Sequence, residues 1–106
     1  MKSFNFNRWL ISQLRRLSFR VPRVYSIVKD AARLDRGIYQ CQICKSKVRN
    51  GDYAIDHIRP VIDPSTGFRS WDDYIDRLFC GPEGLQLICH PCHDKKTERE
   101  NRRRRK

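Results

Sequence analysis

Apolar residues recur at helical spacing in the first third of the chain. Two apolar stripes predict two helices, the first over about residues 7–19 and the second over about residues 23–34. Pro22 separates the two, and Gly37 provides a stop for the second. The first stripe consists of Leu10, Leu14 and Leu17, and the second of Val24, Ile27, Val28 and Ala31. We expect both stripes to face a core and the intervening arginines to face solvent.

The rest of the chain alternates short apolar runs with turn signals. Alternating side chains predict a strand over residues 53–57, and a second short strand is expected at residues 85–88. Between them, residues 70–79 are expected to form a short helix capped by Ser70. A charged helix is expected from about Pro91 onward. This mixture of short strands and separate helices predicts an α+β fold.

Composition limits the size of the hydrophobic core and indicates a negatively charged partner. The chain has 106 residues, of which 39% are hydrophobic and 33% charged, so it forms one small domain whose core needs an additional staple. Lys and Arg number 23 against 12 Asp and Glu, a net charge of +11. Residues 1–29 contain no acid, and the chain ends on Arg102, Arg103, Arg104, Arg105 and Lys106. Nucleic acid is the first candidate partner and an anionic membrane surface the second.

Simpler explanations of the basic ends remain open. The five terminal basic residues are also typical of a solvated tail, and the acid-free start has the composition of an organellar transit peptide. No apolar run approaches the roughly 18 residues of a membrane span, and the N-terminus lacks the apolar core of a signal peptide. We therefore expect no membrane partner.

Five cysteines include two pairs with the spacing C-x-x-C. The pairs are Cys41 with Cys44 and Cys89 with Cys92, and without an export signal this pattern favours a structural zinc site over disulfides. The gap between the pairs is far longer than the ~15–20 residues of a compact zinc ribbon, so a substantial segment is inserted. The fifth cysteine, Cys80, follows an apolar run and is expected to be a buried thiol rather than a ligand.

Polar residues with catalytic chemistry gather near the two predicted strands. Asp56 and His57 end the first strand, and His93 directly follows Cys92. Lys96 lies three residues beyond His93, on roughly the same helical face. Taken singly, these residues have ordinary explanations, because an Asp-His pair is often merely polar and His93 could be an alternative zinc ligand.

Together these segments resemble the HNH endonuclease family. The resemblance rests on residues 54–60 (AIDHIRP), residues 85–97 (LQLICHPCHDKKT) and the flanking C-x-x-C pairs, which resemble the zinc-containing branch. Residues 67–71 (GFRSW) and 74–80 (YIDRLFC) are similar to HNH proteins of bacteriophages. The resemblance covers about residues 37–98.

The resemblance implies a small ββα-metal module with a four-cysteine zinc site, preceded by two basic helices. Three segments are expected: a helical extension (1–36), the module (37–98) and a basic tail (99–106). His57 would be the general base, while Asp56 and His93 would hold one catalytic divalent metal (Mg²⁺, Mn²⁺ or Ni²⁺). The expected contacts to DNA phosphates come from Arg59, Lys96, Arg102, Arg103, Arg104 and Arg105.

The resemblance also implies partners and a location. The substrate would be double-stranded DNA, other phage DNA-processing proteins are further candidate partners, and the location would be the cytoplasm of a bacterial host. Two other interpretations are a zinc-stapled DNA-binding module without cleavage and a zinc-stapled protein–protein adaptor. Asp56, His57 and His93 favour the enzyme.

One position departs from the family and favours the non-catalytic binder. The family has Asn where this chain has Gly84, and that Asn ties the loop between the strands by side-chain hydrogen bonds. Glu83 and Asn50 are candidate substitutes. Asn is expected to be tolerated at position 84, with activity kept or raised.

Overall fold

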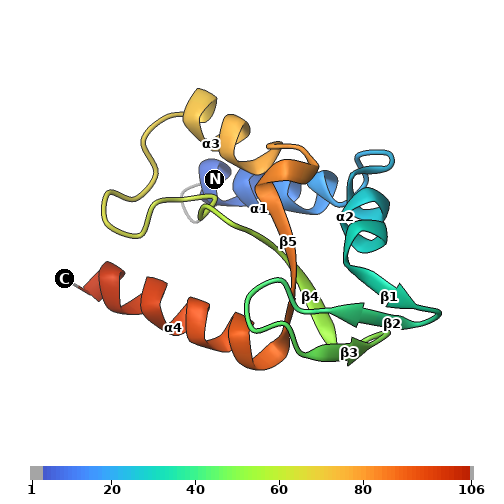
Figure 1. The fold of residues 1–106 in the computed structure, drawn as a ribbon. Coiled ribbons are helices and arrows are strands. Elements are labelled where there is room, and N and C mark those ends of the chain that lie inside the picture. Colours follow the sequence, from blue (N-terminus) through green and yellow to red (C-terminus); the bar gives the residue numbers. More distant parts are fainter. Residues whose placement is uncertain (1–3, 106) are drawn as a thin grey trace.

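Four α-helices and two small antiparallel sheets make up residues 4–105, the part of the chain that the computed structural model describes (Figure 1). The helices are α1 (Phe6–Ser18), α2 (Val24–Ala32), α3 (Trp71–Leu78) and α4 (His90–Arg105). The strands are β1 (Arg33–Asp35), β2 (Ile38–Gln40), β3 (Lys47–Arg49), β4 (Tyr53–His57) and β5 (Leu85–Cys89). A 3₁₀ turn, η1 (Pro82–Gly84), precedes β5. The predicted α+β class is confirmed.

The antiparallel ribbon of β4 and β5 connects the two ends of the fold. Tyr53 pairs with Cys89 at one end of the ribbon, and His57 pairs with Leu85 at the other. Leu87 and Ile88 of β5 are fully buried, which explains why this strand reads as an almost continuous apolar run. Both predicted strands are confirmed, and β5 leads without a loop into α4.

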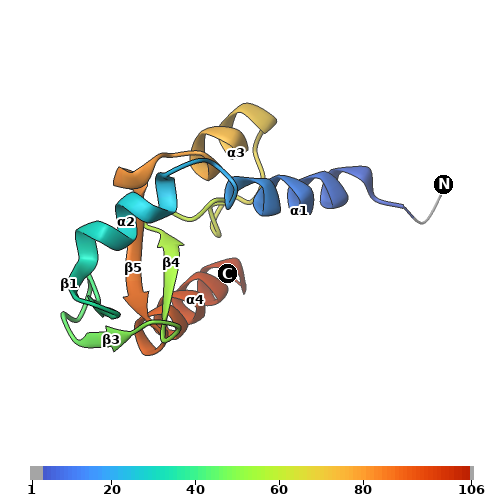
Figure 2. The same ribbon diagram turned by 90° about the vertical axis from the view of Figure 1, so that its right-hand side faces the viewer.

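The two N-terminal helices pack against different parts of the chain. Val28 and Ala32 of α2 are buried in a cluster with residues of β2 and β5. α1 instead packs on α3, where the Tyr74 hydroxyl donates a hydrogen bond to the carbonyl of Ile11 at 3.0 Å. Figures 1 and 2 show α1 and α3 near one end of the β4–β5 ribbon and α4 at the other end.

The apolar faces of α1 and α2 differ from the predicted stripes. Leu17 is 50% exposed and Ile27 is 47% exposed, although both were expected to face a core. Their places in the clusters are taken by Ile11 of α1 and by Tyr25 and Ala32 of α2. Both helices are short, so a second set of residues at the same three- and four-residue spacing can form the buried face in place of the predicted one.

One predicted boundary was wrong. The second helix ends at Ala32, and Arg33 and Leu34 belong to β1 of the three-stranded sheet β1–β2–β3, which the sequence did not predict. At the C-terminus, α4 continues through most of the expected tail, to Arg105. No helix within residues 4–105 has the length and apolar character that a membrane crossing requires.

The predicted cap of α3 is confirmed. The Ser70 hydroxyl accepts a hydrogen bond from the backbone N–H of Asp73 at 3.1 Å. The Asp73 carboxylate does not return to the cap; it pairs with Arg77 one turn later, and Arg77 also donates to the carbonyl of Pro60 at 3.1 Å. These contacts fasten α3 to the loop that follows β4.

Candidate metal centre and adjoining cavity

The first cysteine pair lies in a tight turn after β2. The carbonyl of Cys41 accepts from the N–H of Lys45, and the N–H of Cys41 donates to Ser46, both at 2.9 Å. Lys45 has a positive φ of 67°, which closes the turn. Gln42 fastens this turn to β5, because its N–H donates to the carbonyl of Leu87 at 2.9 Å and its side-chain oxygen accepts from the N–H of Leu87 at 2.6 Å.

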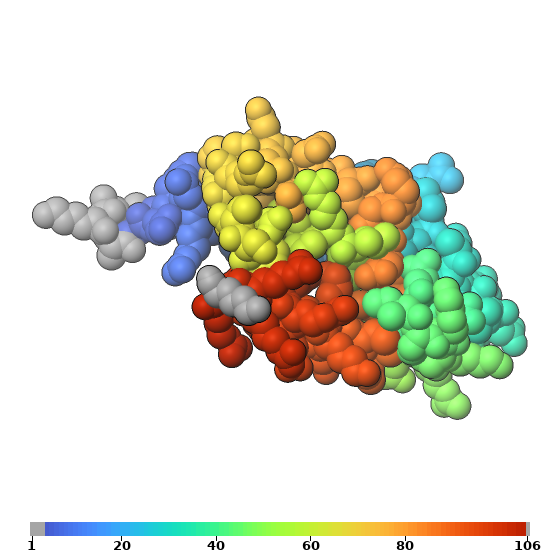
Figure 3. Space-filling model, turned by 60° about the vertical axis from the view of Figure 1, so that its left-hand side comes forward, coloured from blue at the N-terminus to red at the C-terminus, as the bar shows by residue number. Residues whose placement is uncertain are grey.

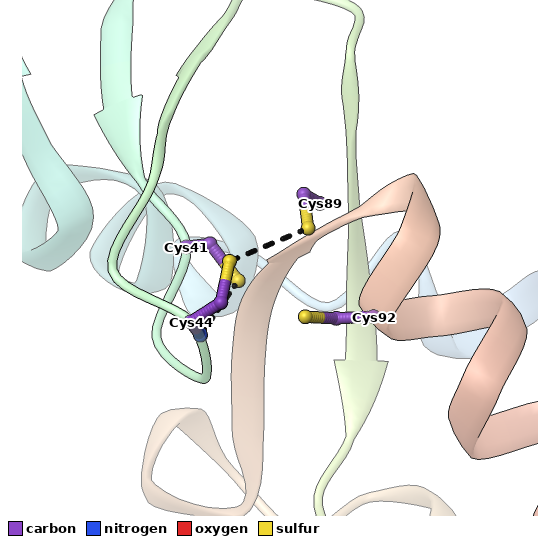
Figure 4. A group of neighbouring side chains, drawn as sticks. All are labelled: Cys41, Cys44, Cys89 and Cys92. Carbon is purple, nitrogen blue, oxygen red and sulfur yellow. Dashed lines mark hydrogen bonds between the residues drawn. The ribbon is translucent and has the colours of Figure 1, made fainter.

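The second pair lies at the junction of β5 and α4. Cys89 is the last residue of β5, and Cys92 lies in the first turn of α4. The pairing of β4 with β5 and the Gln42 contacts bring this junction to the first pair. Figure 4 shows the sulfur atoms of all four cysteines gathered between the turn and the start of α4.

The four thiol groups fit a tetrahedral zinc ion. Their sulfur atoms all lie within 4.8 Å of one another, and Cys44 Sγ is 3.7 Å from Cys89 Sγ. Zinc–sulfur bonds of about 2.3 Å in a tetrahedron place neighbouring sulfurs about 3.8 Å apart. The predicted convergence of Cys41, Cys44, Cys89 and Cys92 is therefore confirmed, and the cluster could hold a metal ion such as zinc.

The thiols have unequal affinities for protons. Burial acts to raise the pKa of Cys41, but hydrogen bonds from the backbone N–H groups of Cys89, Cys44 and Ile43 outweigh it and lower the pKa to about 6. Contact with the Cys89 side chain, followed by burial, raises the pKa of Cys92 to about 12. A divalent cation would offset the repulsion among four thiolates, which is a second reason to expect a metal here.

Cys80 lies outside this cluster, between α3 and η1. It is half-buried against the core that α2 and β5 share, and burial raises the pKa of its thiol. Its side chain occupies the space beside Gly84, where an added Cβ would lie 2.4 Å from Cys80 Sγ and 2.8 Å from Cys80 Cβ. The expectation that Asn is tolerated at position 84 was therefore wrong, because any side chain there collides with Cys80.

Backbone groups tie the turn at Gly84, where the resemblance led us to expect Asn. The N–H of Ile58 donates to the carbonyl of Gly84 at 2.9 Å, which extends the ribbon past His57. The Asn50 side chain accepts from the Tyr53 hydroxyl at the opposite end of β4, so it does not substitute for the missing Asn.

A polar cavity of about 290 Å³ lies between α4, the end of β4 and the loop that follows it. In Figure 3, the red α4 lies directly below the yellow segment that contains this loop. The cavity brings together Asp56, His57 and His93, which the sequence predicted as a catalytic group. It is also lined by Arg15, Pro60, Val61, Ile62, Lys96, Thr97, Glu100 and Arg104.

His57 is held by the end of α3. Its Nε2 lies 2.9 Å from the carbonyl of Leu78, and because a carbonyl only accepts, Nε2 carries the proton and donates. In the neutral ring, Nδ1 then keeps its lone pair. This contact fixes both the orientation and the tautomer of the imidazole, which are the properties that a proton acceptor needs.

Asp56 is in contact with a cation from α4. Lys96 Nζ lies 2.9 Å from Asp56 Oδ2 and 2.6 Å from Glu100 Oε1. Burial acts to lower the pKa of Lys96, but the Glu100 and Asp56 carboxylates outweigh it and raise the pKa. Among residues 4–105, Asp56 Oδ2 is buried without a hydrogen-bond donor, so the ion pair is its sole polar contact.

The donors in the cavity fit a hard or borderline divalent cation. A carboxylate and an imidazole suit Mg²⁺, Mn²⁺ or Ni²⁺, and Asp56 offers a buried oxygen that lacks a hydrogen bond. The cysteine cluster is the sole group of three or more converging metal-binding side chains within the described part of the chain. Asp56 and His93, the ligands expected from the sequence, both line the cavity, and a cation held by these two alone would need oxygens of the substrate or water to complete its shell.

The basic residues expected to contact DNA are spread over different faces. Arg104 lines the cavity, whereas Arg59 is exposed in a separate hollow beside Arg77. Arg102 pairs with Glu98 and faces the side of α4 that carries Cys92. Arg103 and Arg105 are exposed. Lys96 points inward and is only 13% exposed.

Two charged cavity residues were missed by the sequence analysis. Arg15 comes from α1, far away in the sequence, and no local pattern marks it as part of this cavity. Glu100 follows Lys96 by four positions, so the spacing of a helical ion pair is a signal that would have found it.

The chain matches no protein-family model, no curated protein and no solved structure. The resemblance to HNH endonucleases thus rests on the residues of this chain alone.

Proposed function

We propose that this protein is a metal-dependent endonuclease of the HNH type, which hydrolyses phosphodiester bonds in double-stranded DNA. One observation carries the proposal: Asp56 and His57 of β4 share a cavity with His93 of α4. The order β4, β5, α4 agrees with a ββα-metal module. Cys92, the last residue of the cysteine cluster, lies directly before His93 in the chain.

The proposed chemistry divides between His57 and the metal ligands. His57 Nδ1 accepts a proton from the attacking water while Leu78 holds Nε2. Asp56 and His93 would hold the divalent cation, which would supply positive charge near the phosphate that is cleaved. The four cysteines would hold a zinc ion that fastens the start of α4, and Cys92 lies directly before His93 there.

The charge of the cavity rim supports a polyanionic substrate. Arg15 of α1 and Arg104 of α4 line the same cavity and can each contact a phosphate of the DNA backbone. Such contacts position the duplex without reading its sequence, so we propose binding that depends strongly on salt and little on sequence. Phage origin and a bacterial cytoplasmic location remain predictions from the resemblance.

The second candidate function is DNA binding without cleavage. The Lys96–Asp56 ion pair favours it, because an ammonium already contacts the carboxylate that would hold the metal.

Supercoiled plasmid separates the two candidates. The protein is incubated with plasmid without added metal and with Mg²⁺, Mn²⁺ or Ni²⁺. Nicked or linear product that requires the added cation supports the enzyme. A retarded but uncut plasmid under every condition would leave only the binding module.

A further inference from the structure

Lys96 differs from the other basic residues of α4 in its surroundings. Its side chain is 13% exposed, and its ammonium reaches carboxylates on two elements, Asp56 of β4 and Glu100 of α4. Its neighbour Lys95 is exposed on another face of the same helix. Enclosure of a lysine is costly unless its charge is paired, so the position of Lys96 reflects its two partners.

In the triad of Asp56, Lys96 and Glu100, one ammonium lies between two carboxylates. Arg15 and Arg104 line the same cavity, but Lys96 is the cation in contact with both carboxylates. The shorter contact is to Glu100, at 2.6 Å against 2.9 Å to Asp56. The contact with Asp56 also lacks hydrogen-bond geometry, since Asp56 Oδ2 has no donor among the described residues. Glu100 is therefore the closer and hydrogen-bonded partner of the ammonium.

A divalent cation and the Lys96 ammonium compete for the same carboxylate. Two cations bound to Asp56 would repel each other strongly in a partly buried cavity. Glu100 lies one helical turn from Lys96 and already contacts its ammonium, so it can retain the lysine when Asp56 takes up the metal.

We propose that Lys96 is a displaceable counterion of the metal site and that Glu100 is the residue that holds it aside. The ammonium neutralises Asp56 until a divalent cation binds, and it then pairs with Glu100 alone. This inference rests on the proposed function, because it takes Asp56 to be a metal ligand. It makes Glu100 a positioning residue that acts through Lys96 and does not itself contact the metal.

The proposal predicts opposite effects of two substitutions on metal affinity. Lys96→Gln removes the competing charge and keeps a side chain that can donate to Asp56, so Mn²⁺ should bind about tenfold more tightly. Glu100→Gln leaves Asp56 as the sole carboxylate for Lys96, so Mn²⁺ should bind several-fold more weakly. Lys95→Gln is the matched control for the general loss of one positive charge on α4, and it should change the affinity less than twofold.

A double-mutant cycle tests the mechanism, with Mn²⁺ titrated calorimetrically into the zinc-loaded full chain without DNA. If Glu100 acts by holding Lys96, Glu100→Gln should have no effect on Mn²⁺ affinity in the Lys96→Gln background. An equal weakening in both backgrounds would make Glu100 a plain electrostatic neighbour or a ligand and would overturn the proposal. Thermal unfolding checks that each variant folds, and Lys96→Met replaces Lys96→Gln if that variant does not.

Asp56→Asn separates this inference from the proposed function. Mn²⁺ binding that is lost in Asp56→Asn but unaffected by Lys96→Gln or Lys96→Met would overturn the inference and leave the proposed metal site in place. Absence of Asp56-dependent Mn²⁺ binding in the wild type and in Lys96→Gln would remove the metal site itself, and both proposals with it.

Discussion

The start of α4 serves two polar sites of opposite construction. Cys92 and His93 are neighbours in the sequence, yet Cys92 joins the cysteine cluster and His93 lines the cavity. The cluster is built from the turn after β2 and the β5–α4 junction, and its four thiols repel one another when all are ionised unless a cation lies between them. The cavity is built from α1, β4, the loop after β4 and α4, and it already contains the Lys96 ammonium against Asp56.

This difference indicates two different uses of metal. A site whose ligands are incompatible with one another couples metal binding to folding. A site whose charges are internally paired is folded without its cation and can exchange it. We therefore expect zinc to act as part of the structure and the second cation to act as a reactant that comes and goes.

The largest predicted effect is the loss of zinc. Cys89→Ser should remove zinc and unfold the chain near room temperature, because structural zinc contributes on the order of 10 kcal/mol and the core is small. Elemental analysis and thermal unfolding measure the two outcomes. Cys80→Ser is the control and should keep one zinc per chain. A Cys89→Ser protein that melts like the wild type would show that the cluster is not a structural site.

Next in size is the effect of His57 on catalysis. His57→Ala should lower the cleavage rate by about 10²–10⁴-fold, the usual contribution of a general base, while the protein still folds and binds DNA. Initial rates of plasmid nicking measure the loss. His90→Ala removes an exposed histidine at the start of α4 and should cut normally. Equal rates for His57→Ala and wild type would exclude His57 from the mechanism.

A smaller effect is expected from crowding the turn before β5. Gly84→Ala should destabilise the fold by about 1–3 kcal/mol, because the new Cβ meets the Cys80 side chain. Cys80→Gly in the same chain should recover part of the loss, since it empties that space. Chemical denaturation of the four combinations measures the coupling, and purely additive free energies would contradict the contact.

The smallest effect concerns the rim of the cavity. Arg15→Gln should reduce the slope of log K against log salt for DNA binding by about 0.9, the value for one phosphate contact. Arg16→Gln is the matched control on the adjacent face of α1, which does not line the cavity. Fluorescence anisotropy with a labelled duplex at several salt concentrations provides both slopes. Identical slopes for Arg15→Gln and Arg16→Gln would remove Arg15 from the interface.

Local chemistry made parts of the fold predictable. The cysteine spacing gave the correct four-residue cluster, and Ser70 and the alternation in β4 marked their elements because capping and strand periodicity are short-range properties. The sheet β1–β2–β3 was missed because each strand has three residues and little burial, so no period-two pattern develops.

Contacts between distant segments were not predictable in the same way. The roles of Leu78 and Arg15 depend on how α3 and α1 dock beside β4, and no pattern within either helix encodes that docking. The Gly84 error has the same origin, because the neighbouring Cys80 side chain fills the space only once η1 has formed. The analogy with the family suggested a missing Asn, whereas the local packing requires glycine.

The central claim is that the two metals have separate roles, and one measurement tests it directly. The wild-type protein is prepared with one zinc per chain and no other divalent cation, and plasmid cleavage is followed before and after Mn²⁺ is added. We predict a folded, DNA-binding protein that does not cut at first, and that cuts after the addition with its zinc content and melting temperature unchanged. Cutting by the zinc-only protein, or intact plasmid after Mn²⁺, Mg²⁺ and Ni²⁺ have each been tried, would contradict the account.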